Sequence, residues 1–220
     1  MPIWARRAVV AAALGVLTGL LLDWRAGLTA AVAVAILDTV HRSRATAAIP
    51  AAVRVTSAQR RTRRRLRRLA RAGYRTLHAR AVPGSNHIID HLVIGPPGVF
   101  AVDSERWDRR LPVRASPGGQ LYHGPYSQAG RLQYAQLAAA EAARLISAGL
   151  ERALRVRPAM VIYGPTVPWR VARISGVDVF SGRRLRRYLR AQARASGAQR
   201  LSEAEIERIH AAAGLALPPR

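Results

Sequence analysis

The sequence predicts an α/β fold for most of the chain, because one helical stripe is followed by three strand-like runs. Apolar and small residues recur at three- and four-residue spacing across residues 55–72, which is typical of the buried side of a helix. Runs that read as strands follow at 74–80, 87–95 and 99–107, and the last two are joined by the turn sequence Gly-Pro-Pro-Gly. We therefore expect a helix and a hairpin to form the first half of the domain.

The second half of the domain continues this pattern with further helices and a strand. Residues 128–148 predict a helix, and the sequence VRPAMVIYG after it predicts a strand. A second arginine-rich helix is expected after Gly182, and a last helix over 202–213 opens with Ser202 and Glu205 at the spacing of a capping box. We interpret this last helix as structural.

Composition restricts the classes of function. At 220 residues the chain has room for one ordinary domain with appendages, and the absence of cysteine excludes disulfides, thiolate metal sites and a cysteine nucleophile. All 36 basic residues are arginine, and the formal net charge is +24. Codon bias explains arginine in place of lysine, but not this excess over 12 carboxylates. The charge predicts a polyanionic partner, either nucleic acid or anionic lipid.

The first 44 residues predict a membrane hairpin of two short apolar helices. Residues 8–22 and 26–37 carry no charge, and arginines flank the pair at both ends. A membrane-spanning helix needs about 20 apolar residues, so the first run is long enough with its flanks and the second is marginal. The flanking arginines place both ends, and the domain that follows, on the cytoplasmic side of the cell membrane. A signal peptide or single anchor, and a buried soluble hairpin, are the alternatives.

The first helix of the domain is surrounded by arginines. No carboxylate occurs between Asp38 and Asp90. Three interpretations remain open: a solvated helix face, contacts to nucleic-acid phosphates, or contact with anionic lipid beside the anchor. The candidate nucleic-acid-binding residues are Arg60, Arg63, Arg64, Arg67, Arg68 and Arg71.

Two aspartates interrupt the apolar strands of the hairpin. Asp90 lies five residues before Gly95 and Asp103 five residues after Gly98, so a symmetric register places them opposite each other. Because side chains alternate along a strand, Glu105 faces the same way as Asp103. An acid is unfavourable in such strands unless it is paired or functional. Asp90, Asp103 and Glu105 are therefore candidate ligands for a shared divalent cation, the alternative being solvent-facing strand residues.

The run IDHLVIGPPGVFAVDS, preceded by AVPGS and an arginine-bearing helix, resembles the nuclease-related domain (NERD) family over roughly residues 56–190. The resemblance implies a restriction-endonuclease-like α-β-β-β-α-β core with a mixed sheet and a metal-dependent nuclease site using Mg²⁺ or Mn²⁺. It divides the chain into the hairpin at 1–44, a linker at 45–55, the domain at 56–195 and a C-terminal helix and tail at 196–220.

The resemblance also shows where this chain departs from the family's pattern. The family pattern implies a glutamate on the first helix, an aspartate in the I-D-H run, and an acid followed two residues later by lysine on the third strand. Asp90 and Asp103 fit, whereas Gln59 and Glu105 stand where glutamate and lysine are expected, and the chain has no lysine. Glu105 brings negative charge towards an anionic phosphate. We therefore expect a membrane-anchored domain that binds nucleic acid or a divalent metal without efficient cleavage. An active DNA nuclease and a membrane-proximal scaffold that binds anionic lipid are the alternatives.

Overall fold

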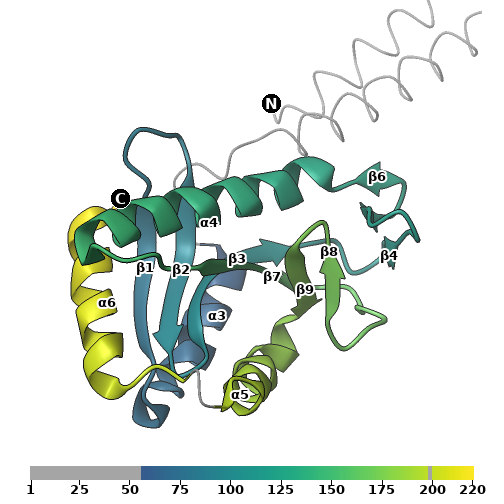
Figure 1. Ribbon diagram of the computed structural model, residues 1–220. Helices are drawn as coiled ribbons and strands as arrows, with labels where there is room; N and C mark the ends of the chain where they lie inside the picture. Colours follow the sequence, from purple (N-terminus) through teal and green to yellow (C-terminus); the bar gives the residue numbers. More distant parts are fainter. Residues whose placement is uncertain (1–55, 198–199) are drawn as a thin grey trace, which may run out of the picture. The chain divides into compact units, whose positions relative to one another are not determined.

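The computed structural model describes residues 56–197 and 200–220 (Figure 1). The predicted membrane hairpin at 1–44 and the linker up to residue 55 lie outside the described residues. One compact unit spans Val55–Arg220. Within the residues described, no helix combines the length and apolar character needed to cross a membrane.

A six-stranded mixed sheet forms the centre of the domain, in the order β1-β2-β3-β7-β9-β8. The strands β1 (Arg75–Ala81), β2 (Ile88–Gly95) and β3 (Gly98–Arg106) form an antiparallel meander. The strand β7 (Val156–Tyr163) runs parallel to both β3 and β9 (Val177–Ser181), and β8 (Ala172–Ile174) closes the edge.

The helices cover the two faces of this sheet. Before the meander comes α3 (Ser57–Arg67), followed by a 3₁₀ turn, η1 (Ala70–Ala72); between β3 and β7 comes α4 (Ala129–Leu150). The chain ends with η2 (Gly182–Arg184), α5 (Leu185–Ala195) and α6 (Glu203–Ala216). The order α3-β1-β2-β3-α4-β7 fits the α/β nuclease-like core that the resemblance implied, and the mixed sheet is confirmed.

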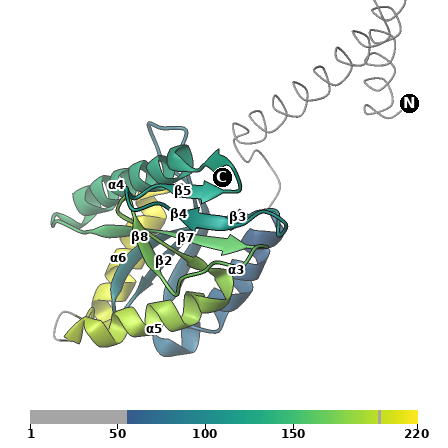
Figure 2. The ribbon, with the colours of Figure 1, turned by 90° about the vertical axis from the view of Figure 1, so that its right-hand side faces the viewer.

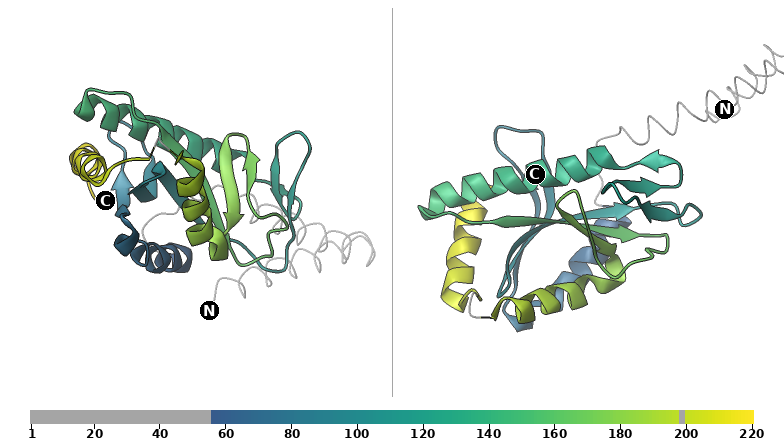
Figure 3. Two further views of the ribbon diagram at one scale, coloured as in Figure 1. Left: turned by 60° about the horizontal axis from the view of Figure 1, so that its bottom comes forward. Right: turned by 45° about the vertical axis from the view of Figure 1, so that its right-hand side comes forward.

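Separate apolar clusters hold the helices to each face. Leu92, Ala101 and Ile146 belong to the cluster beneath α4 and α6, whereas Leu66, Phe100 and Leu189 belong to the cluster beneath α3 and α5. Figures 2 and 3 show α4 on one side of the sheet and α3 with α5 on the other. This three-layer arrangement separates the arginine-rich helices from α4 and α6.

Two local features differ from the predictions. The first helix ends at Arg67 rather than at residue 72, and Gly73, with φ of 76°, completes the 3₁₀ turn that carries the chain into β1. A small second sheet was not predicted; its strands are β4 (Val113–Ala115), β5 (Leu121–His123) and β6 (Tyr126–Ser127). Strands of two or three residues are too short to show an alternating pattern.

Candidate functional site

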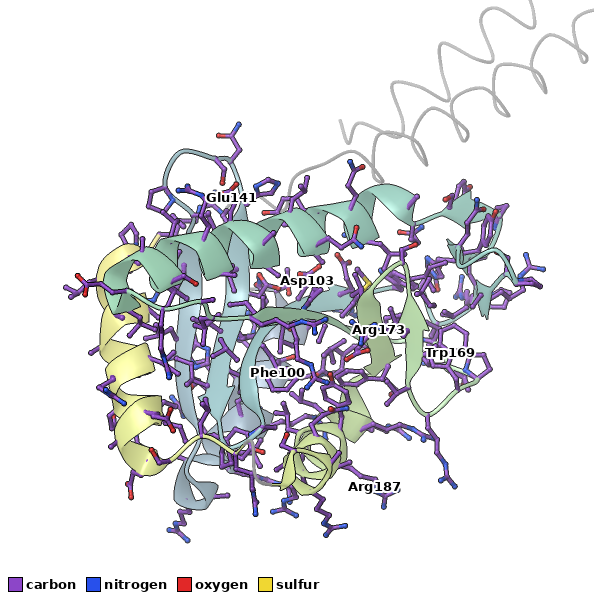
Figure 4. All side chains as sticks on the ribbon, in the orientation of Figure 1. Phe100, Asp103, Glu141, Trp169, Arg173 and Arg187 are labelled. Carbon is purple, nitrogen blue, oxygen red and sulfur yellow. The ribbon has the colours of Figure 1, made fainter. Side chains whose placement is uncertain are left out.

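The hairpin register places the two predicted aspartates side by side. His91 pairs with Val102 and Gly95 with Gly98, so continuing the register by one residue sets Asp90 opposite Asp103. Both lie at the end of the hairpin where β2 begins and β3 finishes. Asp103 lies between the sheet and α4 (Figure 4). The register predicted from the sequence is therefore confirmed.

Ser104 and Gln59 bind this acid pair. The Ser104 backbone N–H donates to Asp90 Oδ2 and to Asp103 Oδ1, at 2.9 Å in each case. Gln59 Nε2 donates to Asp90 Oδ1. The first-helix position implied by the resemblance thus does reach Asp90, although it presents an amide rather than a carboxylate.

The start of α3 holds Gln59 in this position. Thr56 and Gln59 form a capping box, in which Gln59 Oε1 accepts from the Thr56 backbone N–H at 2.6 Å. One turn later, Thr62 Oγ1 accepts from Ser104 Oγ at 2.8 Å and lies 2.9 Å from Tyr163 OH. These contacts join α3 to β3 and β7, so the helix cannot shift without disturbing the acid pair.

The paired carboxyl groups hold a proton at neutral pH. Burial raises the pKa of Asp103 to about 8, and the neighbouring Asp90 charge adds to this effect. Burial also raises the pKa of Asp90, while hydrogen bonds from protonated Asp103, from Gln59 and from Ser104 oppose the rise. The raised pKa of Asp103 makes it the proton carrier of the pair.

Glu105 is engaged by residues that the sequence analysis did not identify. Arg131, near the start of α4, forms an ion pair with Glu105 Oε1, and Trp107 Nε1 donates to Oε2 at 3.1 Å. Burial and the Asp103 charge raise the pKa of Glu105 to about 7, against the opposing effect of Arg131. Arg131 was missed because its proximity depends on how α4 docks on the sheet, which residue spacing does not encode.

The donor set fits a divalent cation only in part. Asp90 and Asp103 offer hard oxygen ligands, and their shared proton marks excess negative charge that a cation would neutralise. Both Glu105 oxygens already have partners, as does Gln59 Oε1. Across the described part of the chain, no three His, Asp or Glu side chains are grouped so as to hold a metal ion. The set Asp90, Asp103 and Glu105 stays a prediction.

An arginine-lined groove lies next to this site, with a volume of about 1230 Å³. Its walls come from α3, from the segment after β3, from the segment after β7 and from η2. Trp107, the partner of Glu105, lines it, whereas Asp90, Asp103 and Glu105 do not. Its nine arginines are Arg61, Arg64, Arg65, Arg68, Arg106, Arg109, Arg110, Arg183 and Arg184.

The groove divides the arginines that were predicted to bind nucleic acid. Arg64 and Arg68 line it, but Arg60, Arg63, Arg67 and Arg71 do not. Arg63 and Arg67 instead lie near His78 on β1, where they help to lower its pKa to about 4, after the larger effect of burial. The helix therefore carries two arginine stripes that face different surroundings.

His87 and His91, the two histidines nearest to Asp90 in the sequence, have partners other than the acid pair. His91 Nδ1 lies 2.8 Å from His78 Nδ1, and the His87 ring packs edge-on against Tyr134. His87 and His91 therefore have separate partners.

The fold and its acid pair define an α/β protein of nuclease-like architecture. Residues 55–162 match the family model of the nuclease-related domain, which supports the NERD family for this segment and indicates a nuclease-related function. The match includes Gln59, Asp90, Asp103 and Glu105. Searches of curated proteins and of solved structures find no match to the chain.

The shared proton predicts a pH dependence of stability. The folded-state pKa values of Asp103 and Glu105 exceed their ordinary values, so the native state holds protons that the unfolded chain releases. This stabilisation is complete below about pH 4 and is lost as pH rises through about 7 to 8. We expect Asp103→Asn to raise the Tm by about 5 °C relative to the wild type at pH 8.5, with a smaller gain at pH 5.5.

Thermal melting of the full chain from pH 5.5 to 8.5 checks this expectation. Glu141→Gln is the matched control, because Glu141 is a half-buried acid of α4 that forms an ion pair with Arg144. Equal pH slopes for the wild type and Asp103→Asn would show that the acid pair is fully ionised.

Proposed function

We propose that this domain binds nucleic acid through its arginines, binds a divalent cation weakly at Asp90 and Asp103, and cleaves nucleic acid poorly. The observation that carries the proposal is the satisfaction of the acid site by its own side chains. Gln59 donates to Asp90, Asp103 retains a proton, and Arg131 neutralises Glu105. A bound Mg²⁺ or Mn²⁺ would acidify water at this position.

The amide at position 59 supports weak metal binding. A glutamate there would add a third negative charge beside Asp90 and would favour a cation. Gln59 instead satisfies Asp90 with a hydrogen bond, and its own oxygen is held by Thr56. The cation must therefore compete with an arrangement that is already satisfied.

The partners of Glu105 support weak cleavage. Lysine at this position of the family pattern would offer a mobile cation to the reacting phosphate. Glu105 has the opposite charge, and its ion pair with Arg131 directs that guanidinium towards a protein carboxylate. Arg106 is no substitute, because its Nη1 donates to Ser57 Oγ on the α3 side at 3.0 Å.

Cleavage is tested by restoring the family pattern. Plasmid cleavage by the wild type with Mg²⁺ or Mn²⁺ should be weak or undetectable. Glu105→Lys combined with Gln59→Glu should raise the rate at least tenfold, since one transition-state contact is worth about 10² to 10³ in rate. The glutamate introduced at position 59 compensates the positive charge that the lysine introduced at position 105 adds beside Arg131.

The control for charge reversal is Glu141→Lys, on α4 away from the acid pair, which should leave the rate unchanged (Figure 4). Asp103→Ala in the double variant should abolish the gain. Brisk cleavage by the wild type that Asp103→Ala removes would instead establish an active nuclease, with Arg131 available as its cation.

Nucleic-acid binding is expected to depend strongly on salt. Phosphate contacts release counterions, so the affinity of the full chain for DNA should fall steeply between about 50 and 200 mM salt, with little sequence preference. Replacing Arg63, Arg64, Arg67 and Arg68 by glutamine should abolish most of the binding. Fluorescence anisotropy measures both effects, and binding that is insensitive to salt would rule out a phosphate-based contact.

We also propose that the apolar residues 1–44 anchor the chain in the cell membrane, with the domain on the cytoplasmic side. The support is the length of the two apolar runs and their flanking arginines. Membrane fractions should retain the full chain after carbonate or high-salt washing, since hydrocarbon burial does not depend on charge. Release by salt alone would contradict the anchor, and export of a reporter fused after Arg220 would favour a signal peptide.

A further inference from the structure

We infer that the arginine groove between α3 and η2 is a binding site for duplex nucleic acid, held by its phosphates. This inference rests on the proposed function and gives it a location and a substrate class. The groove uses arginines that the family match does not reach, because Arg183 and Arg184 lie beyond residue 162.

Charge is segregated between the two helical layers. Residues 56–73 and 182–197, which contain α3, η2 and α5, hold fourteen arginines and no carboxylate. The layer of α4 and α6 carries Glu141, Glu203, Glu205 and Glu207. In Figure 4, Glu141 lies on α4 and Arg187 extends outward from α5 on the other side of the sheet. A polyanion is therefore attracted to the α3 and α5 side.

The groove collects this charge on facing walls. Arg61 and Arg64 are exposed on α3, Arg68 directly after it, and Arg183 on η2. The segment after β3 also lines the groove, and Arg109 and Arg110 of this segment are exposed. Phosphates that enter the groove meet guanidinium groups from several directions, which suits a double-stranded backbone with phosphates on both strands.

Close backbone packing maintains the floor of the groove. The Trp107 backbone N–H donates to Tyr163 O at 2.9 Å. Gly164 follows with φ of 117°, and a Cβ there would lie 2.1 Å from Trp107 O. Only glycine at position 164 allows the segments after β3 and β7 to approach this closely.

The lining favours a duplex over a single strand. Proteins that bind single strands stack the bases on exposed aromatic rings. The aromatic residues that line this groove, Trp107 and Tyr163, are each only 7% exposed. Trp107 stacks on His123, and Tyr163 OH contacts Thr62. A duplex offers phosphates outward and needs no stacking surface.

The same face lacks large exposed apolar residues, so any contact with a lipid surface would rest on charge alone. The exposed large apolar residues of the described chain are Tyr134, Leu137, Val171 and Leu215, and none lies on α3 or α5. Peripheral membrane binding combines charge with buried apolar side chains. A concave arginine surface without them fits a charged rod better than a bilayer.

The experiment compares three triple variants of the full chain in nonionic detergent, each losing three positive charges. The groove variant is Arg61→Gln, Arg64→Gln and Arg68→Gln. The second variant changes Arg63 and Arg67 on α3 and Arg71 on η1, none of which lines the groove. The third changes the exposed arginines Arg144, Arg155 and Arg208, none of which lines the groove. Thermal melting confirms that each variant is folded.

The readout is anisotropy with a labelled 30-base-pair duplex and a single strand of the same length, at about 100 mM salt. The groove variant should lose about tenfold to hundredfold in duplex affinity, with a salt slope shallower by about 3. The variant of Arg63, Arg67 and Arg71 should lose less duplex affinity. The duplex affinity of the third variant should stay within about threefold of that of the wild type. The wild type should prefer the duplex.

Each failure has a distinct meaning. No binding of either probe by the wild type would overturn the proposed function itself. Equal losses of duplex affinity in the groove variant and in the variant of Arg63, Arg67 and Arg71 would overturn the assignment of the groove as the binding site, but not the proposed function. A wild-type preference for the single strand would do the same. Displacement of the duplex by micelles doped with phosphatidylserine, but not by undoped micelles, would assign the groove to lipid.

Discussion

Ser104 links the acid pair to the arginine-rich helix α3, and the arrangement of the two aspartates depends on it. Its backbone N–H is shared by Asp90 and Asp103, while its hydroxyl donates to Thr62 on α3. One residue thus fixes the acid pair on one face of the sheet and the arginine helix on the other. Because alternation along β3 places the hydroxyl and the acids on opposite faces, no neighbouring residue could replace it.

This constraint separates the two chemical features of the domain. The carboxyl groups lie between the sheet and α4, whereas the arginines gather on the side of α3 and α5. They meet only near Glu105 and Trp107, at the end of β3. A nucleic-acid backbone bound in the groove, as proposed, would reach the edge of the acid site, where Glu105 is already paired with Arg131. The proposed binding and cleavage would therefore depend on different residues.

The sequence predicted the elements with strong periodic patterns and the contacts that follow from register. The Asp90 and Asp103 pairing followed from a symmetric turn, and the mixed sheet followed from the family resemblance. Arg131, the groove and the small second sheet were not predicted. Arg131 meets Glu105 only after α4 docks across the sheet, and the groove combines α3 with η2, about 120 residues later in the chain. Contacts between distant elements leave no local spacing pattern.

The claim that the acid site is satisfied without a metal is tested most directly by the protonation state of Asp103. Carbon-13 chemical shifts of the aspartate carboxyl groups, followed from pH 4 to 10 without divalent ions, report it for each residue in turn. The expected result is a protonated Asp103 that titrates near pH 8. If both groups titrate below about pH 5, as ordinary aspartates do, the carboxylates are not sharing a proton and the central claim is wrong.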